Sequence, residues 1–443
     1  MGRSLAYPAG MARATTWRNW AGNQESAPLA VHHPASEDEV VTLVRRAAEE
    51  GVPVKAVGSG HSFTDAALTP GHLVDLDLCD DVVHVDTERF QVTVQAGMPL
   101  WRLNEVLEGR GLAMPNLGDI AYQTVAGATS TATHGTGATL PGLAAQIVGM
   151  RVVTADGSVV ACSADQEPDV FHCARVGVGA LGIVTAVTLQ VVPAFHLRVV
   201  EEPMRVADVL ADLDAFVDGN DHFEFFWVPH TGWALTKQNN RTTEAPAPRP
   251  RWQELRDDHL YENVLFGLAC RLGKLRPSAI PRLVRSVPSA GRVSYVDASH
   301  RVFASPRHVR FVEMEYAIPR EACGEALERV RAMVRDRGFQ ISFPVEVRFT
   351  AGDDIPLSTA HGRDTCYIAV HLYRGTPYHA YFSAVEQIMD DYGGRPHWGK
   401  LHFQTAATLA PRYPEWDRFQ AVRRRLDPDG RFANAYTRRV LGA

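Results

Sequence analysis

The sequence predicts an α+β protein built from two domains. Its 443 residues exceed what one hydrophobic core normally serves. Segments with strand-like alternation are interleaved with segments of helical periodicity, and the pattern of elements changes near residue 193. Apolar residues make up 45% and charged residues 22% of the chain, which is the balance of a folded globular protein.

The N-terminal part begins with a helix and two strands. In residues 37–51, EDEVVTLVRRAAEEG, apolar side chains recur on one helical face, acidic residues open the helix and Gly51 closes it. The following VPVKAVGSG, residues 52–60, alternates like a strand and ends in a glycine-rich turn. Residues 73–78, LVDLDL, alternate again, which predicts the second strand.

The same mixture of elements continues to the end of this part. Residues 91–94 predict a strand and residues 99–111 predict a helix. Residues 147–160 predict two strands that turn at Asp156 and Gly157, a dipeptide favoured in tight hairpins. We therefore expect this part of the chain to be α+β.

The second part begins after Pro193, which ends the predicted strand IVTAVTLQVV, residues 183–192. From there the chain contains longer helices and aromatic strands such as FEFFWV, residues 223–228. Residues 244–251, EAPAPRPR, carry three prolines and predict an exposed extended loop. The remaining pattern predicts a sheet covered by helices on one side. Its strands are expected at 311–319, 345–350 and 367–373, and its helices near 320–337 and 378–392.

Charge and cysteine content exclude several classes of protein. The formal net charge is −6 and neither sign forms a long run, so no nucleic-acid partner is expected. The chain opens without the apolar stretch of a secretory signal and contains no window of roughly 18 apolar residues. We expect a cytoplasmic protein without an integral membrane segment. No CxxC pair occurs, which predicts free thiols rather than disulfides or structural zinc. The six cysteines are Cys79, Cys162, Cys173, Cys270, Cys323 and Cys366.

Residues 177–182, GVGALG, match the spacing of a dinucleotide-binding loop. Such a loop must be followed by a helix, because the helix N-terminus holds the pyrophosphate. Here the β-branched residues of 183–192 predict a strand instead. We therefore reject a Rossmann fold.

A second glycine-rich loop, VGSGHSF, residues 57–63, follows the strand at residues 52–57. Successive backbone amides in conformations that glycine permits form a concave site for phosphate oxygens without any lysine. The alternative is a plain turn. Residues 123–137, QTVAGATSTATHGTG, supply small residues for close approach to a flat ligand and hydroxyls for its polar edge, or else form a tight core turn.

Several motifs in one order carry a resemblance to a known family. They are NWAGN at 19–23, GSGHS at 58–62, NLGD at 116–119, ATHGTG at 132–137, GALGIVTAVTL at 179–189 and RPHWGK at 395–400. Together they resemble the aldonolactone oxidase and alditol oxidase branch of the vanillyl-alcohol oxidase flavoproteins. The resemblance implies a PCMH-type FAD-binding domain of two subdomains at residues 1–193, a cap domain with an antiparallel sheet covered by helices at 194–393, and a segment at 394–443 that returns to the flavin.

The resemblance also implies the cofactor and its contacts. His61 stands where this family bonds a histidine covalently to the 8α-methyl of FAD. Asp119 stands where the members that oxidise alditols carry serine, which favours a lactone substrate. Ile183 is expected to contact the far end of FAD through its backbone. The other implied FAD contacts are Gly58, Ser59, Gly60, Ser62, Phe63, Asp119, Thr124, Gly127, Thr131, Ala132, Thr133, His134 and Lys400.

Glu346 and Arg348 are the main catalytic candidates. They are two residues apart on the predicted strand VEVRFT, so both side chains lie on one face while the apolar residues lie on the other. The alternative is a surface ion pair, but family position favours the active site. Oxidation of an alcohol by flavin needs a base near the hydroxyl and a cation near the reduced ring. Arg348 and Lys400 are the candidate cations, and Glu346 is the candidate base or orienting group.

His371 matches a histidine that this family places near the substrate, with Tyr373 as a weaker candidate on the same face. The alternative for His371 is a core histidine bonded to a neighbour. Gly399 allows a close turn before Lys400, and Trp398 is expected to wall the pocket. We reject a metal site because His371, His379, His397 and His402 show no ligand spacing. No GxSxG occurs, so hydrolysis by a serine nucleophile is not expected.

The resemblance favours oxidation of a gulono- or arabinono-type 1,4-lactone by hydride transfer to flavin N5. Gly118, small and expected close to the flavin, favours O2 as the electron acceptor, with H2O2 as product. The alternatives are an alditol oxidase acting on xylitol or sorbitol, a dehydrogenase with another acceptor, and a flavin-binding protein without turnover.

Overall fold

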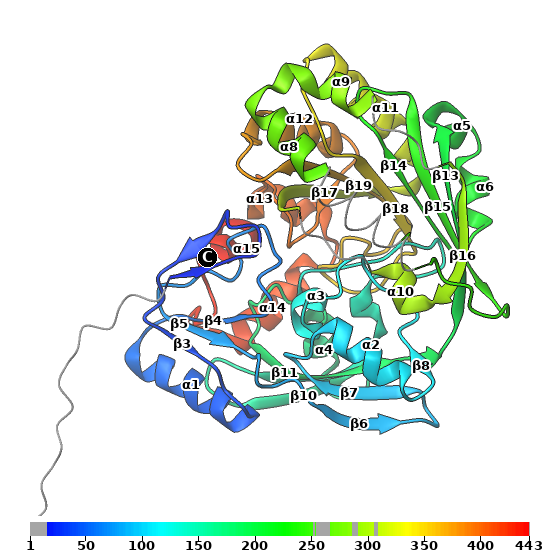
Figure 1. Ribbon diagram of the computed structural model, residues 1–443. Helices are drawn as coiled ribbons and strands as arrows, with labels where there is room; N and C mark the ends of the chain where they lie inside the picture. The colour runs from blue at the N-terminus through cyan, green and yellow to red at the C-terminus, as the bar shows by residue number, and fades with distance from the viewer. Residues whose placement is uncertain (1–15, 251–252, 254–265, 286–290, 305–308, 443) are drawn as a thin grey trace, which may run out of the picture.

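The computed structural model describes residues 16–250, 253, 266–285, 291–304 and 309–442. Two sheet-based parts face each other, and the last three helices pack against the first of them (Figure 1). The mixed helix and sheet architecture confirms the predicted α+β class. No helix in the described ranges is long and apolar enough to cross a membrane.

A small parallel sheet opens the first part. It has the strand order β3, β5, β4. Helix α1 begins after Ser36, whose side chain accepts a hydrogen bond from the Glu39 amide, and ends at Gly51, which has a φ of 69°. The elements are β1 (Trp17–Arg18), β2 (Glu25–Ser26), β3 (Ala30–His32), α1 (Glu37–Glu50), β4 (Val54–Val57) and β5 (His72–Asp75).

A five-stranded antiparallel sheet follows, in the order β10, β9, β11, β7, β6. The GVGALG segment leads directly into strand β11, so the rejection of a Rossmann helix is confirmed. The predicted helix at 99–111 is shorter at both ends. The elements are β6 (Val82–Asp86), β7 (Gln91–Gln95), α2 (Leu100–Glu108), β8 (Leu112–Ala113), α3 (Val125–Ser130), η1 (Leu143–Gln146), β9 (Ile147–Val153), β10 (Val159–Ser163), α4 (Pro168–Ala174), β11 (Ile183–Gln190) and β12 (Val192–Pro193).

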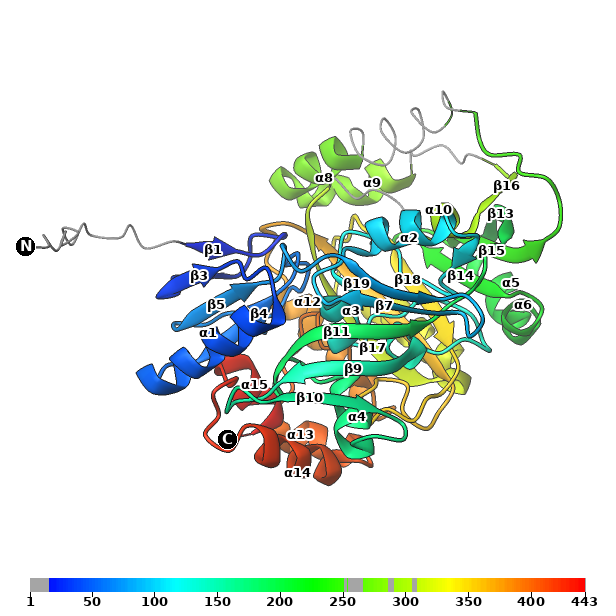
Figure 2. The same cartoon turned by 90° about the horizontal axis from the view of Figure 1, so that it is seen from below.

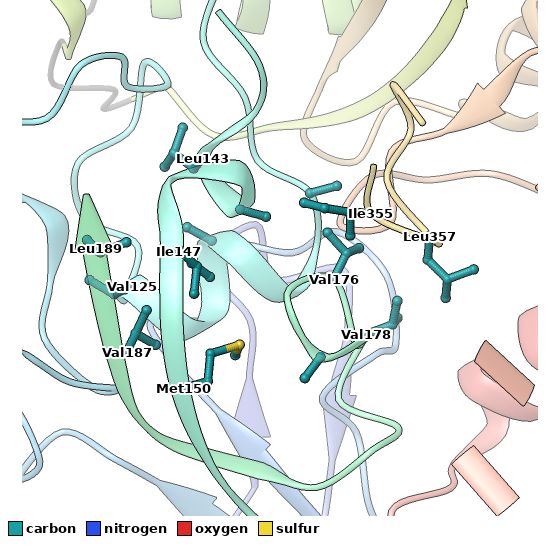
Figure 3. Packing of buried hydrophobic residues seen from close by; sticks show 14 of the residues in the cluster. Val125, Leu143, Ile147, Met150, Val176, Val178, Val187, Leu189, Ile355 and Leu357 are labelled. Atoms are coloured by element: carbon teal, nitrogen blue, oxygen red, sulfur yellow. The ribbon is translucent and has the colours of Figure 1, made fainter. Parts of the chain in front are cut away.

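The core of the first part also receives side chains from the second. Figure 3 shows Ile147 of β9 and Val187 of β11 in one apolar cluster with Ile355 and Leu357, which lie on the loop 351–364 between two strands of the second part's sheet. Burying such side chains stabilises each by about 1.5–3 kcal/mol. The two parts therefore share a continuous apolar contact that fixes their relative position.

The second part is an eight-stranded antiparallel sheet in the order β16, β13, β15, β14, β18, β19, β17, β20. The predicted strands at 223–228, 311–319, 345–350 and 367–373 all lie in it. Its strands are β13 (His196–Arg205), β14 (His222–Trp227), β15 (Trp233–Thr242), β16 (Val293–Ala298), β17 (Phe311–Pro319), β18 (Val345–Thr350), β19 (Thr365–Tyr373) and β20 (Arg395–Pro396).

Helices cover one face of this sheet, as predicted (Figure 1). Alternate residues such as Val347, Ile368 and Met314 point into the apolar core beneath α11 and α12. The helices of this part are α5 (Val206–Ala211), α6 (Leu213–Asp218), α8 (Phe266–Leu275), η3 (Pro277–Ala279), α9 (Ile280–Arg285), α10 (Ser299–Phe303), η4 (Arg320–Ala322), α11 (Cys323–Asp336) and α12 (His379–Asp390). The intervening residues of the same strands form the opposite face, which is polar and looks toward the first part.

After β20 the chain returns to the first part. Helices α13 (Ala406–Leu409), α14 (Trp416–Leu426) and α15 (Ala435–Leu441), with η5 (Ala410–Arg412), lie beside α4 and the parallel sheet (Figure 2). Residues 244–250 of the predicted proline-rich loop are mostly exposed, and Arg251 lies outside the described residues. All six cysteines are free and buried, which confirms the predicted thiols.

Candidate active site

The GSGHS loop connects β4 to the site and has the properties of an anion cradle. Within the described residues, the backbone N–H groups of 59–62 have no hydrogen-bond acceptor. Gly60 has a φ of +68°, a conformation that favours glycine. A Cβ at Gly58 would lie 2.3 Å from Thr124 Oγ1, so only glycine fits there. Four free consecutive amides suit a diphosphate.

His61 projects from this loop with its ring stacked on Trp20, at a centroid distance of 5.3 Å. Its Nδ1 atom is buried and has no hydrogen-bond partner among the described residues. Burial, with the nearby charge of Lys400, lowers the pKa of His61 to about 4. The imidazole is therefore neutral at physiological pH and keeps a nucleophilic lone pair.

The threonine-rich segment forms α3 and the turn after it. Thr124 caps the helix by accepting from the Gly127 amide. The hydroxyl of Thr131 donates to the Gly127 carbonyl, and that of Thr133 accepts from Gln123. Ala132 has a positive φ of 62°. Thr124 lies beside Gly58 of the GSGHS loop, and Ile183 is buried at the start of β11.

Gly118 is closely packed. A Cβ at this position would lie 3.0 Å from the His134 carbonyl oxygen and 3.2 Å from Thr133 Cγ2. Its small size therefore serves close packing on that side, and the expected role of Gly118 in favouring O2 stays a prediction.

Arg348 joins the two parts of the protein. It comes from β18, and its guanidinium forms ion pairs with Asp119 of the first part, with Glu346 of the same strand and with Glu224 of β14. The bond from Nε to Glu224 is 2.7 Å long. Arg348 and Glu346 are both buried, so the alternative of a surface ion pair is wrong.

The single positive charge of Arg348 cannot balance three carboxylates, and this affects the pKa of Glu346. Burial raises its pKa well above the usual range; the charge of Arg348 opposes this rise, and the negative charge of Asp119 adds to it. This shift favours the protonated form of Glu346, which can donate a hydrogen bond. This protonation state fits an orienting group better than a base.

Lys400 and His371 meet at Glu313 of β17. Lys400 forms an ion pair with Glu313, and His371 Nε2 lies 3.5 Å from the other carboxylate oxygen. Burial opposes the charged form of Glu313, but Lys400 and His371 outweigh it and hold the pKa of Glu313 at about 2. The Nζ atom of Lys400 also lies 5.3 Å from the centre of the Phe63 ring. Lys400 is thus a fixed cation beside the His61 loop.

A second set of buried side chains connects the ATHGTG turn to the eight-stranded sheet. His134 Nε2 lies 3.1 Å from Glu315 Oε1, and the His134 ring stacks on Tyr367 at 3.5 Å. Candidate ligand atoms of His134, Glu315 and His397 lie within 4.8 Å of one another. The His397 Nδ1 atom accepts a hydrogen bond from the Gly399 amide at 3.0 Å, so this nitrogen is already engaged.

The sequence did not point to Glu224, Glu313 or Glu315 as site residues. Each is an acidic residue on the polar face of a strand that is otherwise largely apolar, and this pattern could have identified them as site candidates. Trp398 was wrongly expected to line the pocket. It is fully buried, stacks on Tyr413, and donates to the Leu357 carbonyl at 2.7 Å.

Comparison with known families matches both parts of the chain. The D-arabinono-1,4-lactone oxidase family matches residues 187–440, and an FAD binding domain family matches residues 28–163. Among solved structures, a solvent-stable cholesterol oxidase has a TM-score of 0.83 at 20% identity, covering 97% of each chain. At this identity the likeness concerns the fold, which is that of a PCMH-type flavoprotein.

Curated relatives match along the whole chain. L-gulono-1,4-lactone dehydrogenase of Mycobacterium tuberculosis is 52% identical over 96% of this chain and 99% of its own length. L-gulonolactone oxidase of Bos taurus is 35% identical over 97% and 99%. The chain therefore belongs to the aldonolactone oxidase family and is an FAD-dependent oxidoreductase.

Proposed function

We propose that the protein oxidises a gulono- or arabinono-type 1,4-lactone at the polar face of the eight-stranded sheet. The observation that carries this is the buried Arg348, held between carboxylates from both parts of the protein. FAD bound there supplies a two-electron acceptor that takes a hydride from the substrate carbon at N5. We further propose that residues 1–193 and 394–443 hold FAD, and that residues 194–393 hold the substrate.

The two cations have different tasks in this proposal. Lys400 lies beside Phe63 and His61, where it stabilises the negative charge that accumulates on the reduced ring. Arg348 presents a planar fork of donors, which suits the oxygen atoms of a lactone. Both positive charges are fixed before the substrate arrives, Arg348 by the buried Glu224 and Lys400 by the buried Glu313.

The substrate hydroxyl must lose its proton as the hydride leaves. Glu346 already carries a proton and orients the hydroxyl by donating to it. His371 receives the hydroxyl proton, because Glu313 lies beside its Nε2 and stabilises the charge that the ring gains.

The Glu346→Gln variant tests whether the Glu346 carboxyl acts in its protonated, uncharged form. Glutamine keeps a hydrogen-bond donor at the same place, so we expect kcat/KM to fall by no more than about tenfold, the value of one neutral hydrogen bond. Wild-type activity is expected to fall as pH rises through the raised pKa, since ionisation adds an uncompensated buried charge, and the variant should lack this fall. A loss of more than roughly a thousandfold, as removal of a general base can cause, would instead identify Glu346 as the base.

We propose that the FAD is attached covalently to His61. A neutral imidazole and a buried nitrogen without a partner support this. Attachment would exchange a C–H bond of the 8α-methyl and the imidazole N–H for a C–N bond, and the isoalloxazine would supply the two-electron sink that the enzyme's own electron acceptor empties.

One observation favours an electron acceptor other than O2. The relative with 52% identity is named a dehydrogenase, whereas the L-gulonolactone oxidase quoted above is 35% identical. We expect turnover with an artificial dye or cytochrome c to exceed O2 consumption under equal substrate. Equal or faster reaction with O2 would contradict this proposal.

The substrate class is tested by steady-state comparison of L-gulono-1,4-lactone with xylitol. Asp119 is held by Arg348, and this pair leaves a charged site where the alditol-oxidising members carry serine. We expect a higher kcat/KM for the lactone; a preference for xylitol would favour an alditol oxidase. We propose a cytoplasmic location, which six free thiols support.

A further inference from the structure

A small cavity lies beside Arg348, at the interface of the two parts. Its lining includes Asp119, Glu224, Lys237, Asn239 and Phe303. The cavity has room for about one water molecule. None of the motifs that carry the family resemblance reaches Lys237 or Asn239.

Asn239 is the unusual member of this lining. The residue is 2% exposed, and its Oδ1 atom has no hydrogen-bond partner within the described part of the chain. A buried acceptor without a partner costs about 1–3 kcal/mol, so such an atom normally meets a water molecule or a ligand. Next to it, Lys237 Nζ lies 3.6 Å from Glu224 Oε1 and stays charged, because Glu224 raises the pKa of Lys237 to about 12 against the effect of burial.

The strand order places this cavity at the far end of the substrate site. Glu313, which pairs with Lys400, lies on β17, and Arg348 lies two strands away on β18, with β19 between them. Glu224 lies on β14, the next strand after β18, and Asn239 lies on β15, the strand after that. Because Arg348 itself lines the cavity, a substrate held at Arg348 reaches it with one short side chain.

Resting on the proposed lactone oxidation, we propose that this cavity binds the terminal hydroxyl of the lactone's side chain, with Asn239 as a specificity-determining residue. A hydroxyl both donates and accepts. It can donate to Asn239 Oδ1 and accept from Lys237, while its methylene group contacts Phe303. The subsite therefore favours a lactone whose side chain has two carbons over one whose side chain has a single carbon.

Asn239→Leu tests the assignment. The variant removes an acceptor that has no protein partner, so its Tm should match or exceed that of the wild type. We expect the ratio of kcat/KM for L-gulono-1,4-lactone to that for D-arabinono-1,4-lactone to fall by about tenfold, as the loss of one hydrogen bond predicts. Asn239→Ser retains a hydrogen-bond acceptor, so its kcat/KM ratio should lie between those of the wild type and of Asn239→Leu.

Asn240→Leu is the matched control. Asn240 is the next residue on β15, and its side chain donates to Asn220 at 2.7 Å on the opposite face of the sheet. This control should leave the ratio at the wild-type value. An unchanged ratio in both Asn239 variants would overturn the subsite and leave a structural water only. If neither lactone reduces the wild-type flavin, the proposed function itself fails.

Discussion

Replacing Arg348 by lysine is expected to lower kcat/KM for L-gulono-1,4-lactone by roughly a hundredfold to a thousandfold. Lysine keeps the positive charge but cannot contact Asp119, Glu224 and Glu346 together, because it lacks the planar fork. Disrupting a buried ion pair costs about 3–5 kcal/mol, and about 1.4 kcal/mol corresponds to a factor of ten. Steady-state kinetics and Tm should be measured together, since part of this cost appears as lost stability.

The matched control for this change is Arg329→Lys. Arg329 pairs with Asp391 on the helix-covered side of the sheet, and that ion pair is largely exposed. Exposed pairs contribute about 0–1 kcal/mol, so kcat/KM and Tm should both stay close to wild type. If the Arg348 variant retained wild-type kcat/KM, Arg348 would not touch the substrate and the site would have to lie elsewhere.

His61→Ala is expected to abolish covalent flavin completely. The wild-type protein, precipitated with acid, should give a yellow pellet and a fluorescent band on a denaturing gel. The variant should release all its FAD into the supernatant, because the GSGHS amides still hold the cofactor but no ring nitrogen is left to bond it. His84→Ala, which changes an exposed histidine on β6, is the control and should keep the fluorescent band.

A fluorescent band that persists in His61→Ala would place the attachment elsewhere. A wild-type protein that binds FAD but gives no fluorescent band would show that the neutral imidazole of His61 is not alkylated. Either result would leave the lactone chemistry of Arg348 and Lys400 untouched.

Sequence analysis predicted those parts of the site whose structure is determined by the local sequence pattern. The glycine-rich turn follows from residues 58–62, and the shared face of Glu346 and Arg348 follows from the two-residue period of a strand. The strand after GVGALG was also predictable, because β-branched residues exclude a helix there.

The remaining features depend on contacts between distant segments. The partner Glu224 lies 124 residues from Arg348, and no local pattern gives the register that brings β14 beside β18. The protonated state of Glu346 depends in turn on the number of carboxylates around one guanidinium, which only the folded structure provides. The burial of Trp398 likewise depends on a distant contact, its hydrogen bond to the Leu357 carbonyl 41 residues away.

The most direct test of the account is anaerobic mixing of the purified holoenzyme with L-gulono-1,4-lactone, followed by visible absorption. We predict that the oxidised flavin bands bleach rapidly in the wild type and much more slowly in Arg348→Lys. Flavin that stays oxidised in the wild type, or bleaches equally fast in both proteins, would contradict a lactone site on the polar face of the sheet.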